Sequence, residues 1–131
     1  MRFMTIYTDV ERDTPPSQEE IEAMGNLIGE MSNAGVLIRT DGLQHSKRGA
    51  RVHITDDGKF SITDGPFTES KEVVGGYAII EVASKAEAIE WTKRFLKVVG
   101  RGTSEIRLMH EQAAFDVDPA QPSLHNTANR A

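Results

Sequence analysis

The sequence predicts an α+β fold of the ferredoxin-like class, a βαββαβ sandwich with an inserted β-hairpin. Two segments carry apolar residues at helical spacing, and each begins with a Ser followed three residues later by a Glu, the pattern of a helix N-terminus. Four segments with alternating or continuous apolar residues flank them in the order strand, helix, strand, strand, helix, strand. That order predicts one sheet with both helices on the same face.

The first strand and the first helix follow from local spacing. Residues 3–8 alternate large and polar side chains, as a half-buried strand does. Ser17 and Glu20 form a capping box, and the helix is expected to end near Asn33 with Gly35 as its C-terminal cap. Five apolar residues at helical spacing define its buried face, namely Ile21, Met24, Leu27, Ile28 and Met31.

A second strand and a hairpin are expected in the middle of the chain. Residues 36–38 form the strand, which residues 41–42, an Asp-Gly pair, interrupt or bend. The hairpin has arms at residues 52–55 and 59–63, and the Asp-Asp-Gly turn at residues 56–58 supplies residue types that accept a positive φ.

The hairpin register depends on its loop. If the loop has three residues with Gly58 in the left-handed region, Val52 faces Ile62 and Ile54 faces Phe60. A two-residue loop misaligns these pairs, because a slip of one residue moves a side chain to the other face.

The last third of the chain predicts strand, helix and strand. Residues 77–82 are nearly continuously apolar, which predicts a central strand buried on both faces or nearly so. A capping box at residues 84–87 opens the second helix, and the glycines of residues 100–102 end it before a strand at residues 105–109. The second helix is expected to bury Ala88, Ile89, Thr92, Phe95 and Leu96.

Composition excludes several classes of protein. The chain has 131 residues, a formal net charge of −5 and no cysteine, which rules out disulfides and thiolate chemistry and suits a reducing, cytoplasmic compartment. No nucleic-acid partner is expected of an acidic chain, and no stretch is apolar for long enough to span a membrane. No metal-ligand spacing or cofactor motif is recognised, so neither a metal nor a cofactor is expected. A domain at residues 1–115 and a polar tail at residues 116–131 are expected.

The densest group of chemically active residues lies at residues 64–72. This segment combines a turn, an aromatic residue and four ionisable side chains in one short connection. Asp64 can accept hydrogen bonds from its own turn, Gly65 permits an unusual φ, and Pro66 restrains the next residue. Such a segment is either a rigid connector with a solvated rim or a binding loop held by the scaffold.

These residues and their surroundings resemble the YCII-related family, specifically the branch named for its Asp-Gly-Pro-Phe motif. The resemblance spans roughly residues 1 to 110. It rests on Asp64-Gly65-Pro66-Phe67 followed by Glu69, Lys71-Glu72 and Gly75-Gly76-Tyr77, and on Ala34-Gly35-Val36-Leu37 with Gly42-Leu43 upstream.

The resemblance implies a ferredoxin-like fold in a dimeric, α/β-barrel-like assembly, with a cleft near the first helix and the motif loop. Some members are linked to a His-Asp pair and to dehydrochlorination of hydroxylated aromatics. The candidate His falls at Met24 of this sequence, and a Met can neither take nor give a proton. A His-based mechanism therefore does not carry over.

An enzyme of this sequence needs another base, and Glu69 and Asp64 are the catalytic candidates because burial or a like-charged neighbour can raise a carboxyl pKa. Lys71 is expected to act as a counter-ion or anion clamp. The residues expected to contact a ligand are Phe67, Lys71, Glu72, His45 and Arg51.

Three hypotheses about function stay open. The first is a module that binds a small molecule in a cleft through the motif loop. The second is a lyase or isomerase that uses carboxylate acid–base catalysis, and the third is a non-catalytic dimeric module with a regulatory or structural role. A homodimer is expected, because a sheet with helices on one face leaves its other face in need of cover.

Overall fold

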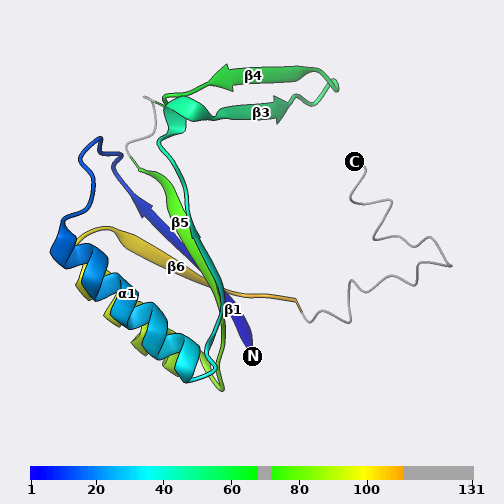
Figure 1. The fold of residues 1–131 in the computed structure, drawn as a ribbon. Coiled ribbons are helices and arrows are strands. Elements are labelled where there is room, and N and C mark those ends of the chain that lie inside the picture. Colours follow the sequence, from blue (N-terminus) through cyan, green and yellow to red (C-terminus); the bar gives the residue numbers. More distant parts are fainter. Residues whose placement is uncertain (68–71, 111–131) are drawn as a thin grey trace, which may run out of the picture.

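A computed structural model describes residues 1–67 and 72–110 of the chain. It contains a four-stranded antiparallel sheet with two helices on one face, and a separate two-stranded hairpin (Figure 1). The strand order β2-β5-β1-β6 is compatible with a ferredoxin-like arrangement, so the predicted α+β fold is confirmed. The elements are β1 (Arg2–Asp9), α1 (Gln18–Asn33), β2 (Leu37–Gly42), the short 3-10 helix η1 (Ser46–Arg48), β3 (Ala50–Ile54), β4 (Phe60–Asp64), β5 (Val73–Glu81), α2 (Lys85–Val99) and β6 (Thr103–Leu108).

The core lies between the helices and the sheet. Phe3 of β1 pairs directly with Ile80 of β5, and both side chains are buried beneath the helices. Successive strand residues point to opposite faces, so Met4 and Ile79 lie on the face without helices and are only half-buried. The central strand is therefore covered on one side only within the described chain. The buried apolar residues are Phe3, Leu27, Met31, Val36, Ile80, Val82 and Ala88.

Both helices begin and end where their caps predict. The Ser17 hydroxyl accepts a hydrogen bond from the Glu20 backbone N–H, and the Ser84 hydroxyl accepts one from the Glu87 N–H, each at 3.1 Å. Gly35 follows α1 with φ 72°, and Gly100 ends α2 with φ 79°.

The predicted burial of one residue in each helix is wrong: Ile21 of α1 is 50% exposed, and Ile89 of α2 is also exposed. Ile89 is 36% exposed, because α2 turns Ala88 and Thr92 toward the sheet and Ile89 lies about 100° farther round the helix. Thr92 can be buried because its hydroxyl donates a 2.7 Å hydrogen bond to the Ala88 carbonyl oxygen.

The expected break at Asp41-Gly42 is also wrong. These residues continue β2 and pair with Tyr77 and Gly76 of β5, and the irregularity in the ladder falls between Leu37 and Arg39. β5 begins at Val73, earlier than predicted, because its glycines are part of the ladder. A Cβ on Gly76 would lie 2.9 Å from the Asp41 carbonyl oxygen, so the glycine permits the close approach of the two strands.

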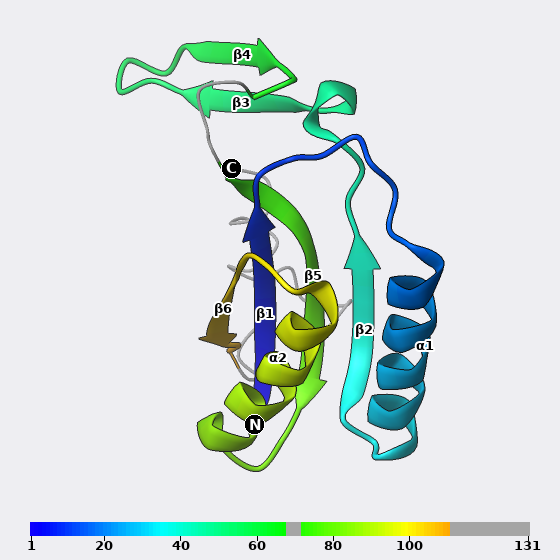
Figure 2. The same cartoon turned by 90° about the vertical axis from the view of Figure 1, so that its left-hand side faces the viewer.

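The hairpin has the register that a three-residue loop predicts. Val52 pairs with Ile62, Ile54 pairs with Phe60, and Gly58 has φ 84°. The hairpin leaves one end of the four-stranded sheet and extends to the side opposite the helices (Figure 1). Viewed from the helix side, it lies across the end of the sheet beyond β1, β2 and β5 (Figure 2).

Candidate functional site

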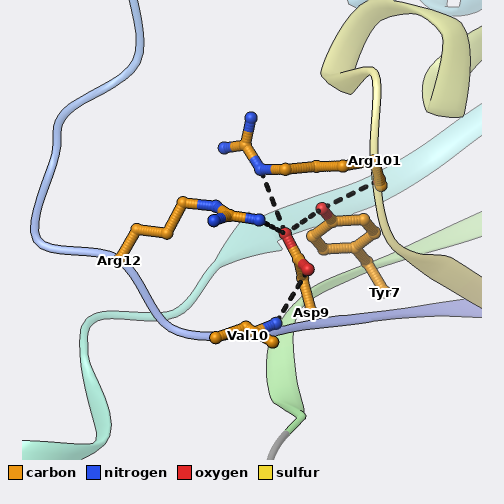
Figure 3. Close-up of polar contacts among 5 residues, drawn as sticks. All are labelled: Tyr7, Asp9, Val10, Arg12 and Arg101. Carbon is orange, nitrogen blue, oxygen red and sulfur yellow. Dashed lines mark hydrogen bonds and ion pairs between the residues drawn. The ribbon is translucent and has the colours of Figure 1, made fainter.

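A polar cluster centred on Asp9 lies where β1 ends and β6 begins (Figure 3). The Asp9 Oδ2 atom lies 3.0 Å from Nε of Arg101 and 3.4 Å from Nη2 of Arg12. The Tyr7 hydroxyl lies 3.1 Å from the same Oδ2 and 3.1 Å from the Arg101 carbonyl oxygen, so two acceptors compete for its proton. The Val10 backbone N–H donates a 2.8 Å hydrogen bond to Asp9 Oδ1.

Two glycines make room for the Tyr7 side chain. Gly102 has φ 90°, and a Cβ there would lie 2.6 Å from the Tyr7 hydroxyl oxygen and 2.5 Å from a ring carbon. A Cβ on Gly75 would lie 3.2 Å from the opposite part of the ring. Because any larger residue at position 102 meets both backbone strain and the Tyr7 ring, this glycine positions the hydroxyl beside Asp9.

The cluster keeps Asp9 ionised and Tyr7 protonated. Burial by itself raises the pKa of the Asp9 carboxyl, but hydrogen bonds from Val10, Tyr7 and Arg101 together with the charge of Arg12 outweigh burial, and the pKa lies below its usual value. Burial and the hydrogen bond to Asp9 raise the pKa of the Tyr7 phenol. One carboxylate therefore faces two guanidinium groups, which leaves one positive charge in excess.

An apolar pocket of about 370 Å³ lies between the two helices and the sheet, and we call it the inner pocket. Met24 and Leu27 of α1 and Trp91 and Phe95 of α2 contribute to its walls. Tyr7 contributes its ring to the same pocket and contacts Phe95 edge to face, with ring centroids 5.4 Å apart. Tyr7 thus belongs to both the inner pocket and the Asp9 cluster.

Three of the predicted ligand-contacting residues come together elsewhere. His45, Arg51 and Phe67 line a second pocket of about 420 Å³ beside the motif loop, which we call the loop pocket. The guanidinium carbon of Arg51 lies 4.0 Å from the centroid of the Phe67 ring, a cation–π contact. The Phe67 backbone N–H donates a 3.0 Å hydrogen bond to the Ser46 hydroxyl.

Glu11, which the sequence did not single out, holds the wall of the loop pocket together. Its carboxylate accepts hydrogen bonds from the Ser46 N–H at 2.5 Å and the Ser46 hydroxyl at 2.7 Å, and it lies 3.6 Å from His45 Nε2. The hydroxyl hydrogen bond from Ser46 is the main reason that the pKa of Glu11 is lowered. Both carboxylate oxygens of Glu11 therefore accept hydrogen bonds from the turn at η1.

The remaining predicted site residues do not join these groups. Asp64 ends β4 opposite Ala50 and is exposed, Glu72 is exposed, and neither lines the inner pocket or the loop pocket. Glu69 and Lys71 lie outside the described residues.

Gly65 of the motif is required for a different reason from the one expected. Its φ is not positive, but a Cβ would lie 1.7 Å from the Ser46 carbonyl oxygen. The Gly65 N–H also donates a 3.0 Å hydrogen bond to the Gly49 carbonyl oxygen. The motif loop is thus seated against the backbone of η1, and steric room is what selects glycine.

Metal and membrane features were also sought in residues 1–67 and 72–110. No three His, Asp or Glu side chains of that part gather as metal ligands would, and no described helix is long and apolar enough to cross a membrane.

Comparison with known families decides the relationship. The sequence matches the YCII-related domain over residues 1–109, which includes every described helix and strand. This chain belongs to the YCII-related family. A search of curated proteins found no match to it. In this YCII-related protein Met24, the position at which the resemblance implies a His, supplies a thioether to the wall of the inner pocket.

The sequence contained only partial signals of the Asp9 cluster. Alternation along β1 places Tyr7 on the same face as Phe3, and a carboxylate closes that strand. Arg101 stands between two glycines after α2. Nothing in the spacing indicates that residues separated by more than 90 positions share one oxygen atom, because only strand pairing brings them together.

Proposed function

We propose that this YCII-related protein binds a small, largely apolar molecule in the inner pocket. The observation that carries the proposal is the position of Tyr7, whose ring lines an apolar pocket and whose hydroxyl belongs to a charged cluster. A pocket of about 370 Å³ lies within the usual size range of small-molecule sites, which combine apolar walls with a few polar groups.

The charge of the cluster favours a ligand with an anionic group. Asp9 neutralises only one of the two guanidinium groups of Arg12 and Arg101. A carboxylate on the ligand would pair with the excess positive charge, while the body of the ligand would contact Trp91 and Phe95. An apolar or aromatic carboxylate is therefore the proposed ligand class.

The geometry supports binding more than acid–base catalysis. Asp9 is ionised, carries four hydrogen-bond or ion-pair partners, and has a lowered pKa, whereas a general base needs a pKa near the working pH. Catalysis by Glu69 and Asp64 stays a separate hypothesis, as does ligand binding by the motif loop through His45, Arg51 and Phe67, which rests on their shared pocket.

Trp91, the single tryptophan of the chain, lines the inner pocket and reports its occupancy directly. We expect 1-naphthoate to change the Trp91 fluorescence and to raise the melting temperature, and the neutral 1-naphthamide to do so more weakly. Ala78→Leu fills the pocket from β5 and should abolish both effects. The matched control is Ala86→Leu on the exposed face of α2, which should leave them unchanged.

Tyr7→Phe separates the contribution of the Tyr7 hydroxyl to ligand binding from the contribution of the Tyr7 ring. The variant keeps the ring in the pocket wall but removes the hydroxyl that reaches Asp9. We expect it to bind naphthoate roughly ten times more weakly, because the hydroxyl no longer holds the Asp9 cluster in place beside the pocket wall. If neither aromatic carboxylates nor their amides alter Trp91 fluorescence or the melting temperature, the proposal is wrong.

A further inference from the structure

The inner pocket exists because small residues occupy one part of the sheet beneath the helices. Successive strand residues point to opposite faces, so every second residue of β5 faces α1 and α2. These residues are Ile80, Ala78 and Gly76, and their size falls from one end of the strand to the other. Ile80 is 1% exposed, whereas Ala78 in the same row is only half-buried. The free space therefore begins above Ala78.

The neighbouring strand β2 repeats this change of side-chain size. Leu37 pairs with Ile80, whereas Thr40 and Gly42 pair with the two smaller residues of β5. All of these residues line the inner pocket. Large apolar side chains on two adjacent strands thus close one end of the pocket.

The opposite end of the pocket is polar. Tyr7 pairs with Gly76 at that end, and its hydroxyl lies 3.1 Å from Asp9 Oδ2. The excess positive charge of Arg12 and Arg101 belongs to the same cluster. The pocket therefore has a polar end and a closed apolar end, which lie at different points along the same strands.

The distance between these two ends is limited. Tyr7 and Phe3 stand four positions apart on β1, which is roughly 13 Å in an extended strand. Beyond the apolar end, Phe3 and Val82 are 3% and 5% exposed and belong to the buried core. Because a close-packed core leaves no room for a ligand, the pocket cannot continue past Ile80.

A ligand with its anionic group at the polar end must place its body along β5. The apolar space that starts at Tyr7 extends over Gly76 and Ala78 and ends at Leu37 and Ile80. The far end of the ligand then meets two large side chains that have little freedom to move. The length of the ligand, and not only its polarity, is thereby restricted.

We propose that the inner pocket selects apolar carboxylates by length, with the carboxylate at the Tyr7 end and the far end of the apolar body stopped by Leu37 and Ile80. This inference rests on the proposed function and narrows its ligand class to carboxylates whose apolar body fits lengthwise between these residues. Leu37 and Ile80 are thus specificity-determining residues.

Straight-chain carboxylates from hexanoate to tetradecanoate test the proposal. Each methylene that enters the pocket should lower the dissociation constant roughly three- to fourfold. The gain should stop where the terminal methyl group reaches Leu37, before tetradecanoate, whose extended chain is longer than the pocket. Isothermal titration calorimetry measures the affinities, and Trp91 fluorescence shows that the chain enters the pocket.

Two substitutions at one position should move this limit in opposite directions. Leu37→Ala opens the apolar end and should move the limit to a longer chain, whereas Leu37→Phe should move it to a shorter one. The matched control is Leu108→Ala, since Leu108 pairs with Phe3 on β6, is 59% exposed and does not line the pocket. It should leave the limit unchanged. Circular dichroism checks that each variant is folded.

Several results would overturn this inference while the proposed function stands, because the response to 1-naphthoate persists in each. These are an affinity that rises steadily through tetradecanoate, a limit that neither Leu37 variant moves, a limit that Leu108→Ala moves equally, and a protein that binds no straight-chain carboxylate. A protein that responds neither to 1-naphthoate nor to any member of the series contradicts the proposed function, and this inference with it.

Discussion

Gly65 and Gly102 show how single residues set the shape of the loops around the two pockets. Gly102 has a positive φ and also faces the Tyr7 ring, so two independent effects select glycine there. Gly65 has no positive φ, and the nearby Ser46 carbonyl group is what excludes a larger residue. The positions of the Tyr7 ring and of the Ser46 carbonyl group thus depend on a neighbouring residue that has no side chain.

We expect Gly65→Ala to lower the free energy of unfolding by roughly 3 kcal/mol or more, because the new Cβ would displace the turn at η1. Gly49→Ala is the matched control, since a Cβ at Gly49 meets the same Ser46 carbonyl oxygen at 3.7 Å, an ordinary contact. Urea denaturation of both variants measures the difference. Equal stabilities would show that the motif loop moves away from Ser46 at little cost.

A prediction of pH dependence concerns Asp9, whose pKa is lowered in the folded chain. A lowered carboxyl pKa stabilises the fold above the unfolded-state pKa of about 3.9, and the stabilisation is lost as the pH falls through the folded-state pKa. We therefore expect Asp9→Asn to be less stable than the wild type at pH 7, with the difference shrinking at pH 3 and below. Urea melts at both pH values check this, and a constant difference would contradict it.

At the scale of elements, contacts within one helical turn set where the helices begin, whereas hydrogen bonds to a neighbouring strand set where the strands begin and end. Ser17 and Ser84 cap their helices as the capping boxes predict, because a cap is a contact within one turn. Asp41-Gly42 reads as a turn in isolation but forms part of β2, because hydrogen bonds to β5 hold it extended. Leu43 continues this contact through its N–H, which donates a 2.9 Å hydrogen bond to the Gly75 carbonyl oxygen.

Removing the side chain of one N-cap residue tests whether a local contact stabilises the start of its helix. We expect Ser84→Ala to lower the free energy of unfolding by about 1 kcal/mol, because the Glu87 N–H loses its acceptor. Ser32→Ala, an exposed position inside α1, should be neutral or slightly stabilising, since alanine has the higher helix propensity. A larger loss for Ser32→Ala than for Ser84→Ala would contradict the assignment of the cap.

At the scale of the whole molecule, the described residues form one α+β unit from which the β3–β4 hairpin projects. The core, both helices and all described strands lie within residues 1–109, the same range that matches the YCII-related domain. The expected tail at residues 116–131 lies outside the described residues. The inner pocket lies on the side of the sheet that carries α1 and α2.

Deletion of residues 117–131 should leave a chain that folds cooperatively, because every buried core residue of the described part of the chain lies before them. Thermal melts followed by circular dichroism, at matched concentrations of full-length and shortened chain, measure this. A melt without a cooperative transition would show that the tail is integral to the domain.

The sequence by itself determined the element order, both helix N-caps and the family, and it limited the hairpin register to two possibilities that depend on the length of the loop. Each of these depends on residues close together in the chain or on a pattern that the chain displays directly. It also selected His45, Arg51 and Phe67, which share the loop pocket. It could not find the Asp9 cluster, the role of Glu11 or the inner pocket. Those depend on contacts such as Asp9 with Arg101 across 92 positions, which only the antiparallel pairing of β1 with β6 creates.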